Sequence, residues 1–382
     1  MASATLYVIY REKLGGVICL DEKWMEYALE LARKGEGFVN PNPMVGAVIV
    51  KDGEVIGEGY HTKFGQPHAE VEAFRSAKES TEGATLYVTL EPCSHYGKTP
   101  PCADLVIEKK LKRVVVGILD PNPLVAGRGI KKLKDAGIDV TVGVLEGECK
   151  KINEIFLKYI LDKKPFVLMK AAVSLDGKIA TAKGESKWIS GEESRERVHK
   201  SRGKYAAIMA GINTVLEDDP QLTCRVKGKK SPIRVIVDSN LRIPLESKII
   251  KTAKNVPVIV ATISDNSNKT KELEAMGAKI LRVDEKNGRV DLSCLVSKLG
   301  EMNIDSILIE GGGTLNYSAL EAGIVDKVEL YIAPKIIGGN AARTFVEGVG
   351  ISRLRDAFKV NFSEVSKVGE DILIEGYIGG EN

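Results

Sequence analysis

Two kinds of hydrophobic pattern alternate along the first half of the chain. Apolar residues recur at helical spacing from Trp24 to Ala32, after Asp21, which can cap such a helix. Short β-branched runs follow, and Asp52-Gly53 between two of them is a hairpin turn signal. The expected strands are 45–50, 55–60, 86–90, 113–117 and 138–142, and the further expected helices are 69–79, 102–110 and 127–136. This alternation is typical of a sheet with helices packed on its faces.

A second series of strands follows a lysine-rich helix expected over 150–162 and a break at Lys163-Lys164-Pro165. The expected strands are 166–173, 206–210, 233–237, 257–261, 279–283, 306–309, 327–333 and 371–377. The two halves share no motif, so we interpret the chain as two fused α/β domains with different activities. We expect an N-terminal extension over 1–20, a first domain over 21–163 and a second over 164–382.

Composition narrows the classes of function. The 382 residues include 55 basic and 52 acidic side chains, and only 5% are aromatic. This balance gives no electrostatic signature of nucleic-acid binding. No apolar run approaches the roughly 18 residues that a membrane span needs, and the first 20 residues lack the ordered parts of a signal peptide. We therefore expect a cytoplasmic protein that acts on a small molecule, with no nucleic-acid partner and no membrane.

The strongest chemical signal is a group of potential zinc ligands. His68 and Glu70 stand two residues apart, and Cys93 and Cys102 each follow a proline. A catalytic zinc takes three protein ligands, here one imidazole and two thiolates, and lowers the pKa of a bound water. Glu70, at the expected start of a helix, would move the proton. This is the logic of the zinc nucleobase deaminases, although eight residues separate the cysteines here instead of two.

Other interpretations of these residues remain open. The two cysteines could be ordinary buried thiols, and His68 a capping or core histidine. A structural zinc site would need a fourth protein ligand, for which His95 in the same loop is a candidate. The Gly-Lys-Thr at 97–99 is not a Walker A motif, because Pro92 occupies the position of its first glycine. Lys98 and His95 could meet a phosphate, or the loop could simply be solvated.

Taken together, the motifs resemble those of the bifunctional deaminase-reductases of riboflavin biosynthesis. The similar stretches are 42–48, 68–70, 89–102 and 120–129 in the first half, and 170–180, 184–190, 211–215, 218–223 and 310–315 in the second. The long insert between the cysteines is a feature of that family, and the resemblance covers about residues 22–380. It implies an N-terminal cytidine-deaminase-like three-layer α/β/α domain and a C-terminal dihydrofolate-reductase-like α/β domain.

The resemblance also implies two reactions. Zinc-dependent deamination of 2,5-diamino-6-ribosylamino-4(3H)-pyrimidinone 5′-phosphate comes first. NADPH then reduces the ribosyl group of 5-amino-6-ribosylaminouracil 5′-phosphate to ribityl. We expect zinc ligands at His68, Cys93 and Cys102 and a catalytic Glu70. Expected substrate contacts in the deaminase are Asn42, His61, Lys98 and Asn122. The family also implies a homo-oligomer, paired through the reductase half.

In the reductase half, the expected cofactor contacts are Ala172, Trp188, Thr214, Asp218, Ser239, Gly312, Gly313, Thr314, Leu315, Asn316, Tyr317 and Ser318. The expected substrate contacts are Lys170, Ser186, Arg202, Leu222, Arg225 and Glu310. Both arginines can bind a sugar phosphate bidentately. In isolation, Trp188 could equally be a core aromatic, Arg202 a surface cation and Asp218 a helix stop.

No Rossmann fingerprint is present, because the nearest match, Gly311 to Gly313, has Asn316 where a further glycine belongs. The bare backbone of this run can still approach a diphosphate at the start of a helix, or it could be only a flexible turn. Two rival functions also remain: a deaminase of tRNA or single strands, and a zinc-stabilised binding protein. The second would be expected to have lost Glu70 or a cysteine, and the chain keeps them all.

Overall fold

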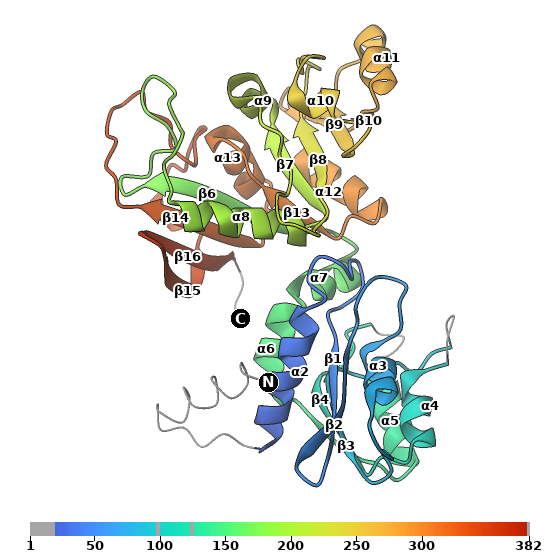
Figure 1. Cartoon of the computed structure of the whole chain (residues 1–382). Helices are drawn as coiled ribbons and strands as arrows, with labels where there is room; N and C mark the ends of the chain where they lie inside the picture. The colour runs from blue at the N-terminus through green and yellow to red at the C-terminus, as the bar shows by residue number, and fades with distance from the viewer. Residues whose placement is uncertain (1–19, 97–99, 123–125, 380–382) are drawn as a thin grey trace. The chain divides into compact units, whose positions relative to one another are not determined.

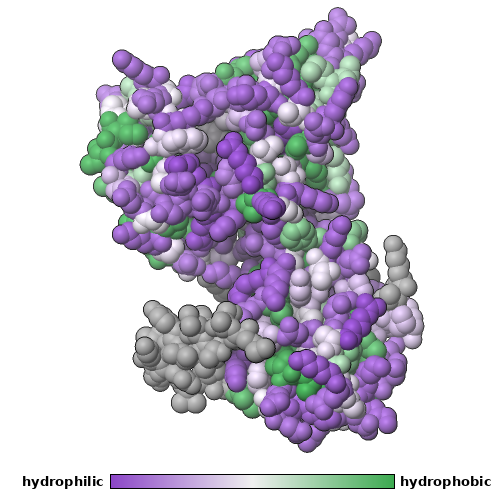
Figure 2. Space-filling model, in the orientation of Figure 1, coloured by the Kyte–Doolittle hydropathy of each residue, from purple (hydrophilic) through white to green (hydrophobic). Residues whose placement is uncertain are grey.

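A computed structural model describes residues 20–96, 100–122 and 126–379, and the chain divides between Asp162 and Lys163 into two compact units. Figure 1 shows both units as sheets with helices. In the space-filling view of Figure 2, hydrophilic side chains cover most of the visible face. Within the described residues, no helix combines the length and apolarity that crossing a membrane requires. The expected extension over 1–20 lies almost entirely outside the described residues.

The first unit is built on a five-stranded sheet in the order β2-β1-β3-β4-β5. Its strands are β1 (Gly46–Lys51), β2 (Glu54–Tyr60), β3 (Thr85–Leu90), β4 (Arg113–Ile118) and β5 (Asp139–Val142). β1 runs antiparallel to β2 and β3, whereas β3, β4 and β5 are parallel. Asp52 and Gly53 both have positive φ, as the expected tight hairpin between β1 and β2 requires.

Helices cover both faces of this sheet. They are α2 (Leu20–Arg33), α3 (Ala69–Ser76), α4 (Cys102–Glu108), α5 (Arg128–Asp135), α6 (Glu146–Ile152) and α7 (Glu154–Asp162). Along β1, Ala47 and Ile49 pack with α3, α4 and α5, while Val48 and Val50 pack with α2 and α6. Gly46 allows a close approach, because a Cβ there would lie 1.9 Å from the carbonyl oxygen of Ala28. The expected three-layer α/β/α architecture is confirmed.

Two local expectations for this unit were wrong. Asp21 lies inside α2, and its carboxylate accepts hydrogen bonds from Tyr87 and Arg113. The single helix expected over 150–162 is two helices that break at Asn153. The buried Asn153 amide pairs with the backbone of Met44, whose N–H donates to Oδ1 at 2.8 Å and whose carbonyl accepts from Nδ2 at 3.0 Å. A long-range polar contact therefore interrupts a helical pattern.

The second unit contains a nine-stranded sheet in the order β10-β9-β8-β7-β13-β6-β14-β16-β15. The strands are β6 (Phe166–Ser174), β7 (Ala207–Gly211), β8 (Ile233–Val237), β9 (Val258–Thr262), β10 (Lys279–Arg282), β13 (Ser306–Ile309), β14 (Lys327–Ala333), β15 (Val360–Val368) and β16 (Asp371–Ile378). The strands from β10 to β14 in this order are parallel, and β16 and β15 add an antiparallel edge.

Helices also cover this sheet, and they are α8 (Glu192–Lys204), α9 (Ile212–Asp218), α10 (Lys248–Lys251), α11 (Ser267–Ala275), α12 (Leu292–Glu301) and α13 (Gly313–Glu321). Along β7, Ala207 and Met209 pack with α12 and α13, whereas Ile208 and Ala210 pack with α9, α10 and α11. Each face of the central sheet thus has its own apolar core, and the expected α/β class is confirmed for this half as well.

The sequence pattern missed strand β15 and the two-residue strands β11 (Glu285–Lys286) and β12 (Arg289–Val290). Strand β15 lies at the edge of the sheet, and most of its residues are exposed, including Val360, Phe362 and Val365. The alternation of buried and exposed positions that normally reveals a strand is therefore absent from it.

Candidate active sites

The three expected zinc ligands lie together in the first unit. His68 directly precedes α3, Cys93 follows β3, and Cys102 begins α4. Nδ1 of His68 is 3.6 Å from Sγ of Cys93 and 3.4 Å from Sγ of Cys102. Tetrahedral zinc with ordinary bond lengths separates a nitrogen and a sulfur ligand by about 3.6 Å. The three side chains therefore fit a zinc ion, and His95 is not part of their cluster.

Glu70 lies in the first turn of α3 and is 3% exposed. Burial raises the pKa of its carboxyl to about 7, although the charge of His68 opposes this shift. A carboxyl group with a pKa near neutrality can both accept and release a proton under physiological conditions. The position and the titration of Glu70 are thus those of a proton carrier beside the metal cluster.

A cavity of about 250 Å³ opens beside these residues. The expected site residues that line it are Asn42, His61, His68, Glu70, Cys93 and Asn122; Lys98 lies outside the described residues. Nδ1 of His61 lies 3.0 Å from the carbonyl oxygen of Pro67, so it donates there and leaves Nε2 to accept from the Asn42 amide at 3.2 Å. Burial lowers the pKa of His61, which favours this neutral form.

Glu91 is a buried residue of this site that the sequence reasoning missed. Its carboxylate accepts hydrogen bonds from the backbone N–H groups of four residues at 2.9–3.2 Å, and these are Asp120, Gly127, Gly129 and Ile130. Asn122, an expected substrate contact, follows two residues after Asp120, one of these donors. In the sequence, Glu91 lies between a strand and Pro92-Cys93. This position does not predict hydrogen bonds to backbone groups 29 to 39 residues away.

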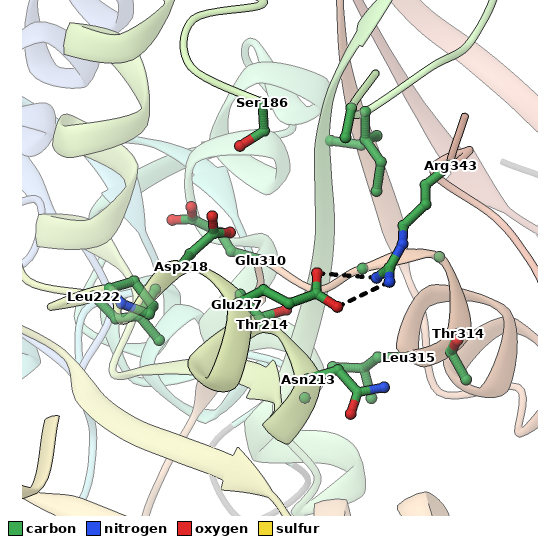
Figure 3. A pocket seen from close by; sticks show the side chains of 18 of the residues that line it. Ser186, Asn213, Thr214, Glu217, Asp218, Leu222, Glu310, Thr314, Leu315 and Arg343 are labelled. Carbon is green, nitrogen blue, oxygen red and sulfur yellow. Dashed lines mark hydrogen bonds and ion pairs between the residues drawn. The ribbon is translucent and has the colours of Figure 1, made fainter. Parts of the chain in front are cut away.

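The second unit has a larger cleft, of about 1490 Å³, at the carboxyl ends of β6, β7, β8 and β13. Its lining includes sixteen of the expected residues, namely Ala172, Trp188, Thr214, Asp218, Ser239, Gly312, Gly313, Thr314, Leu315, Ser318, Lys170, Ser186, Arg202, Leu222, Arg225 and Glu310. Figure 3 shows several of them around the cleft. Trp188 is 63% exposed, so it is not a core aromatic.

Two expected cofactor contacts do not line this cleft. Asn316 is buried and donates to the carbonyl oxygen of Phe345 at 2.7 Å, and the Tyr317 hydroxyl donates to that of Gly350 at 3.1 Å. Helical geometry accounts for the difference, because a turn of 3.6 residues puts Thr314, Leu315 and Ser318 on the side of α13 that lines the cleft and turns the side chains of Asn316 and Tyr317 away from it. Their side chains make these contacts instead of lining the cleft, and their role in cofactor binding stays a prediction.

The start of α13 fits a dinucleotide phosphate. Gly312 caps the helix, and a Cβ on it would meet no atom within 4 Å, so its backbone faces open space. Gly313 is packed tightly, because a Cβ there would lie 2.6 Å from the carbonyl oxygen of Thr344. A bare backbone at the start of a nine-residue helix presents free N–H groups to an anion.

A pair of charges lies deep in this cleft. Nε and Nη2 of Arg202 donate to the two carboxylate oxygens of Glu310 at 2.6 and 2.8 Å, and Nη1 donates to the carbonyl oxygen of Thr223. The guanidinium fork expected to bind phosphate is therefore occupied by Glu310. Burial tends to raise the pKa of Glu310, but the charge of Arg202 holds it below its usual value. Burial lowers the pKa of Lys170, which Glu310 partly offsets.

The sequence reasoning also missed an ion pair in this cleft. It joins Arg343 and Glu217 and is drawn with dashed lines in Figure 3. Asn213, also in the lining, accepts a hydrogen bond from Arg242 at 2.9 Å. Neither contact joins residues that are close in sequence, so no short motif predicts them.

Comparison with known proteins agrees with this division. The "RibD C-terminal domain" family matches residues 165–374, and the "Cytidine and deoxycytidylate deaminase zinc-binding region" matches residues 19–118. The riboflavin biosynthesis protein RibD of Actinobacillus pleuropneumoniae is 51% identical over 93% of this chain and 94% of its own length. The RibD protein of Escherichia coli K12 is 41% identical over 93% of this chain and 98% of its own.

Solved structures are similar over the same extent. The deaminase/reductase of Thermotoga maritima, named for diaminohydroxyphosphoribosylaminopyrimidine and 5-amino-6-(5-phosphoribosylamino)uracil, superposes with a TM-score of 0.84. It is 41% identical and covers 94% of this chain and 99% of its own. Acinetobacter baumannii RibD gives a TM-score of 0.84 at 40% identity, with the same coverage. The chain thus belongs to the RibD family, the bifunctional deaminase-reductases of riboflavin biosynthesis that use zinc and NADPH.

Proposed function

We propose that residues 21–163 deaminate 2,5-diamino-6-ribosylamino-4(3H)-pyrimidinone 5′-phosphate and that residues 164–382 reduce the ribosyl group of the product to ribityl. The Thermotoga relative is named for these two activities. The observation that carries the proposal is the spacing of His68, Cys93 and Cys102, which suits zinc, beside the buried carboxyl group of Glu70. The same chain holds a separate cleft large enough for a dinucleotide and a substrate.

In the deaminase, His68, Cys93 and Cys102 would hold zinc, which when bound supplies a hydroxide ion at neutral pH. Glu70 would take up a proton in the cavity and deliver it to the amino group that leaves as ammonia. Asn42, His61 and Asn122 would orient the pyrimidine ring, with Lys98 as a further contact. The hydrogen bond between the Asn42 amide and His61 supports a fixed orientation for this wall of the cavity.

In the reductase, NADPH would supply hydride to C1′ of the substrate in an open-chain or imine form. Gly312, Gly313 and Thr314 would bind its diphosphate at the start of α13. The further cofactor contacts would be Ala172, Trp188, Thr214, Asp218, Ser239, Leu315 and Ser318. Their common position around one cleft supports this assignment.

The substrate of the reductase would lie against the buried charges of the cleft. Arg202 and Glu310 hold each other, so Glu310 would present its outer edge to the pyrimidine or ribose. Arg225 is exposed in the cleft and would bind the sugar phosphate. Lys170 would meet the opened sugar, and Ser186 and Leu222 would complete the contacts.

A coupled assay on the purified chain tests the proposal. Ammonia release and NADPH oxidation are followed with the diaminopyrimidinone ribosyl phosphate, with and without a metal chelator. We expect ammonia first and NADPH oxidation second, and both should stop when zinc is removed. Ammonia release without NADPH oxidation would refute the reductase assignment. Absence of both with zinc bound would refute the substrate.

We also propose a homo-oligomer that pairs through the reductase unit. Strand β15 forms one edge of the nine-stranded sheet, and Phe362 and Val365 on it are 69% and 62% exposed. Ile372 on the neighbouring strand β16 is 45% exposed. Exposed apolar side chains at a sheet edge favour association with a second copy. Light scattering after size exclusion should give a dimer or larger for the native chain. Phe362→Ser should shift it towards the monomer, and a monomeric native chain would refute the pairing.

A cytoplasmic location is our proposal as well. Five cysteines in the described part of the chain are free thiols, and two of them are the proposed zinc ligands. Thiolate ligands persist in a reducing compartment. Fractionation of cells should recover the enzyme with cytoplasmic markers.

A further inference from the structure

The ion pair between Arg343 and Glu217 crosses the cofactor cleft of the reductase unit. Nη1 of Arg343 donates to Oε2 of Glu217 at 3.0 Å, and Nη2 lies 2.9 Å from Oε1, so the pair is bidentate. Both side chains are 51% exposed. Glu217 belongs to α9, whereas Arg343 comes from the long segment between β14 and β15. An exposed ion pair contributes little to stability. Stability alone therefore does not account for the pair of Arg343 and Glu217.

The backbone that carries Arg343 is fixed to the wall of the cleft. The carbonyl oxygen of Arg343 accepts from the N–H of Ile179 at 2.9 Å. Four residues later, the N–H of Glu347 donates to the carbonyl oxygen of Gly313 at 3.0 Å, and Glu347 also accepts from the N–H of Thr344. The segment is thus tied to the start of α13. The long side chain of Arg343 takes no part in these bonds and can move without breaking them.

Arg343 lines the same cleft as the proposed diphosphate site, and the carbonyl oxygen of the next residue, Thr344, lies close against Gly313 at the start of α13. Figure 3 shows Arg343 extending towards Glu217, with Thr214, Asn213, Leu315 and Thr314 below the pair in this view. All these residues line the same cleft. The two walls are close, since a Cβ on Gly211 would lie 3.8 Å from Cβ of Leu315. A dinucleotide bound along α13 would therefore pass beside the ion pair.

The carboxylates near the ion pair of Arg343 and Glu217 bear on how an anionic cofactor would bind there. The end of α9 carries Glu217, Asp218 and Asp219, three carboxylates that would repel a diphosphate. Asp219 is engaged by Lys248, through its backbone N–H at 2.8 Å and its ammonium group at 3.5 Å. Arg343 neutralises Glu217, and its planar fork suits a phosphate as well as a carboxylate. The same guanidinium thus has two potential anionic partners in one place.

We propose that Arg343 is a cofactor-binding residue, which Glu217 holds in the free enzyme and which transfers to the diphosphate of NADPH when the cofactor binds. This inference rests on the proposed reductase function. Glu217 then competes with the cofactor for one guanidinium. Removing Arg343 weakens cofactor binding, whereas removing the charge of Glu217 strengthens it.

Titration of NADPH fluorescence with the full-length, zinc-loaded enzyme tests the competition. We expect Arg343→Gln to raise the Kd about tenfold or more, the usual range for a hydrogen bond to a charged group. Glu217→Gln should lower the Kd, by about threefold as an exposed ion pair is released. In the Arg343→Gln background, Glu217→Gln should lower the Kd by less than in the native enzyme, because it then relieves only the repulsion of the diphosphate and releases no guanidinium. If the pair were merely structural, both single variants would weaken binding, and that result would overturn the proposal.

Controls separate this proposal from the proposed function. Arg353→Gln breaks another exposed ion pair of the same unit, with Asp356, and should leave the Kd unchanged. NADH has the diphosphate but lacks the 2′-phosphate, so it should show the same relative shifts; shifts confined to NADPH would overturn the diphosphate assignment. Normal binding by the native enzyme with unshifted variants refutes the role of Arg343 alone. Failure of the native enzyme to bind NADPH refutes the reductase function and the role of Arg343 with it.

Discussion

The deaminase cavity and the reductase cleft are built in different ways. His68, Glu70, Cys93 and Cys102 lie within 35 residues of sequence and meet where β3, α3 and α4 begin or end. The reductase cleft draws on residues from Lys170 to Glu347, many of them at the ends of strands. A site made of neighbouring loops is recognisable as a motif. A site made at the edge of a parallel sheet is assembled only when the strands are ordered.

The two sites also differ in what holds their walls. Backbone hydrogen bonds to the buried carboxylate of Glu91 fix the deaminase wall. Ion pairs hold the reductase walls, with Arg202 on Glu310 in the interior and Arg343 on Glu217 at the surface. The first arrangement favours a rigid cavity for one ring, and the second a cleft whose charges can exchange partners with a ligand.

The largest expected effect is a loss of the deaminase activity alone, with the reductase activity unchanged. Glu70→Gln should lower ammonia release by about 10²- to 10⁴-fold, because the proton carrier is lost. Reduction of separately supplied deaminated intermediate should stay at the native rate. Zinc content, measured by atomic absorption, should be unchanged. A parallel loss of both activities would show that the two sites are not independent.

The next effect tests the interior charges of the reductase. Glu310→Ala leaves Arg202 buried without its partner, and breaking a buried ion pair costs about 3–5 kcal/mol. Calorimetry of the full chain should show earlier unfolding of the reductase unit, and NADPH oxidation should be lost while ammonia release persists. Glu310→Gln, which keeps the shape, should destabilise less. Equal stability of both variants and the native chain would contradict the buried pairing.

A smaller effect is expected from the backbone clamp of the deaminase. Glu91→Gln replaces one accepting oxygen with an amide that faces N–H donors, and a hydrogen bond to a charged group is worth about 1.5–3 kcal/mol. The segment that carries Asn122 should loosen, so the KM for the diaminopyrimidine should rise more than kcat falls. Reductase kinetics serve as the internal control. An unchanged KM would remove Glu91 from the positioning of the substrate.

The smallest effect concerns Asp21, which lines neither the deaminase cavity nor the reductase cleft. The hydrogen bonds from Arg113 hold the pKa of Asp21 below its usual value of 3.8, although burial opposes them. The ionised form is therefore favoured by folding, and its stabilisation is present above that value and disappears as the pH falls through the lower native pKa. Asp21→Asn should cost up to about 1 kcal/mol at pH 7. The difference in Tm from the native chain should vanish in strong acid, and a constant difference would contradict the ion pair.

Much of the fold follows from local pattern. The strands from 45–50 to 371–377 were predicted because buried β-branched runs and turn signals are local properties of the sequence. Strand β15 was missed, because an edge strand exposed on both faces lacks the alternation of buried and exposed positions that predicts a strand. The break at Asn153 was missed because its cause, the backbone of Met44, lies 109 residues away.

The sequence by itself determined the two α/β halves, the zinc-ligand types and the family, since each depends on residues close together in the chain or on whole motifs. Their roles in catalysis stay predictions for the experiments above. Only the tertiary structure decided that Glu310 occupies the fork of Arg202, that α13 turns Asn316 and Tyr317 away from the cleft, and that Arg343 meets Glu217 across it. These facts depend on the helix period and on strand order, which bring distant side chains together and which no local pattern records.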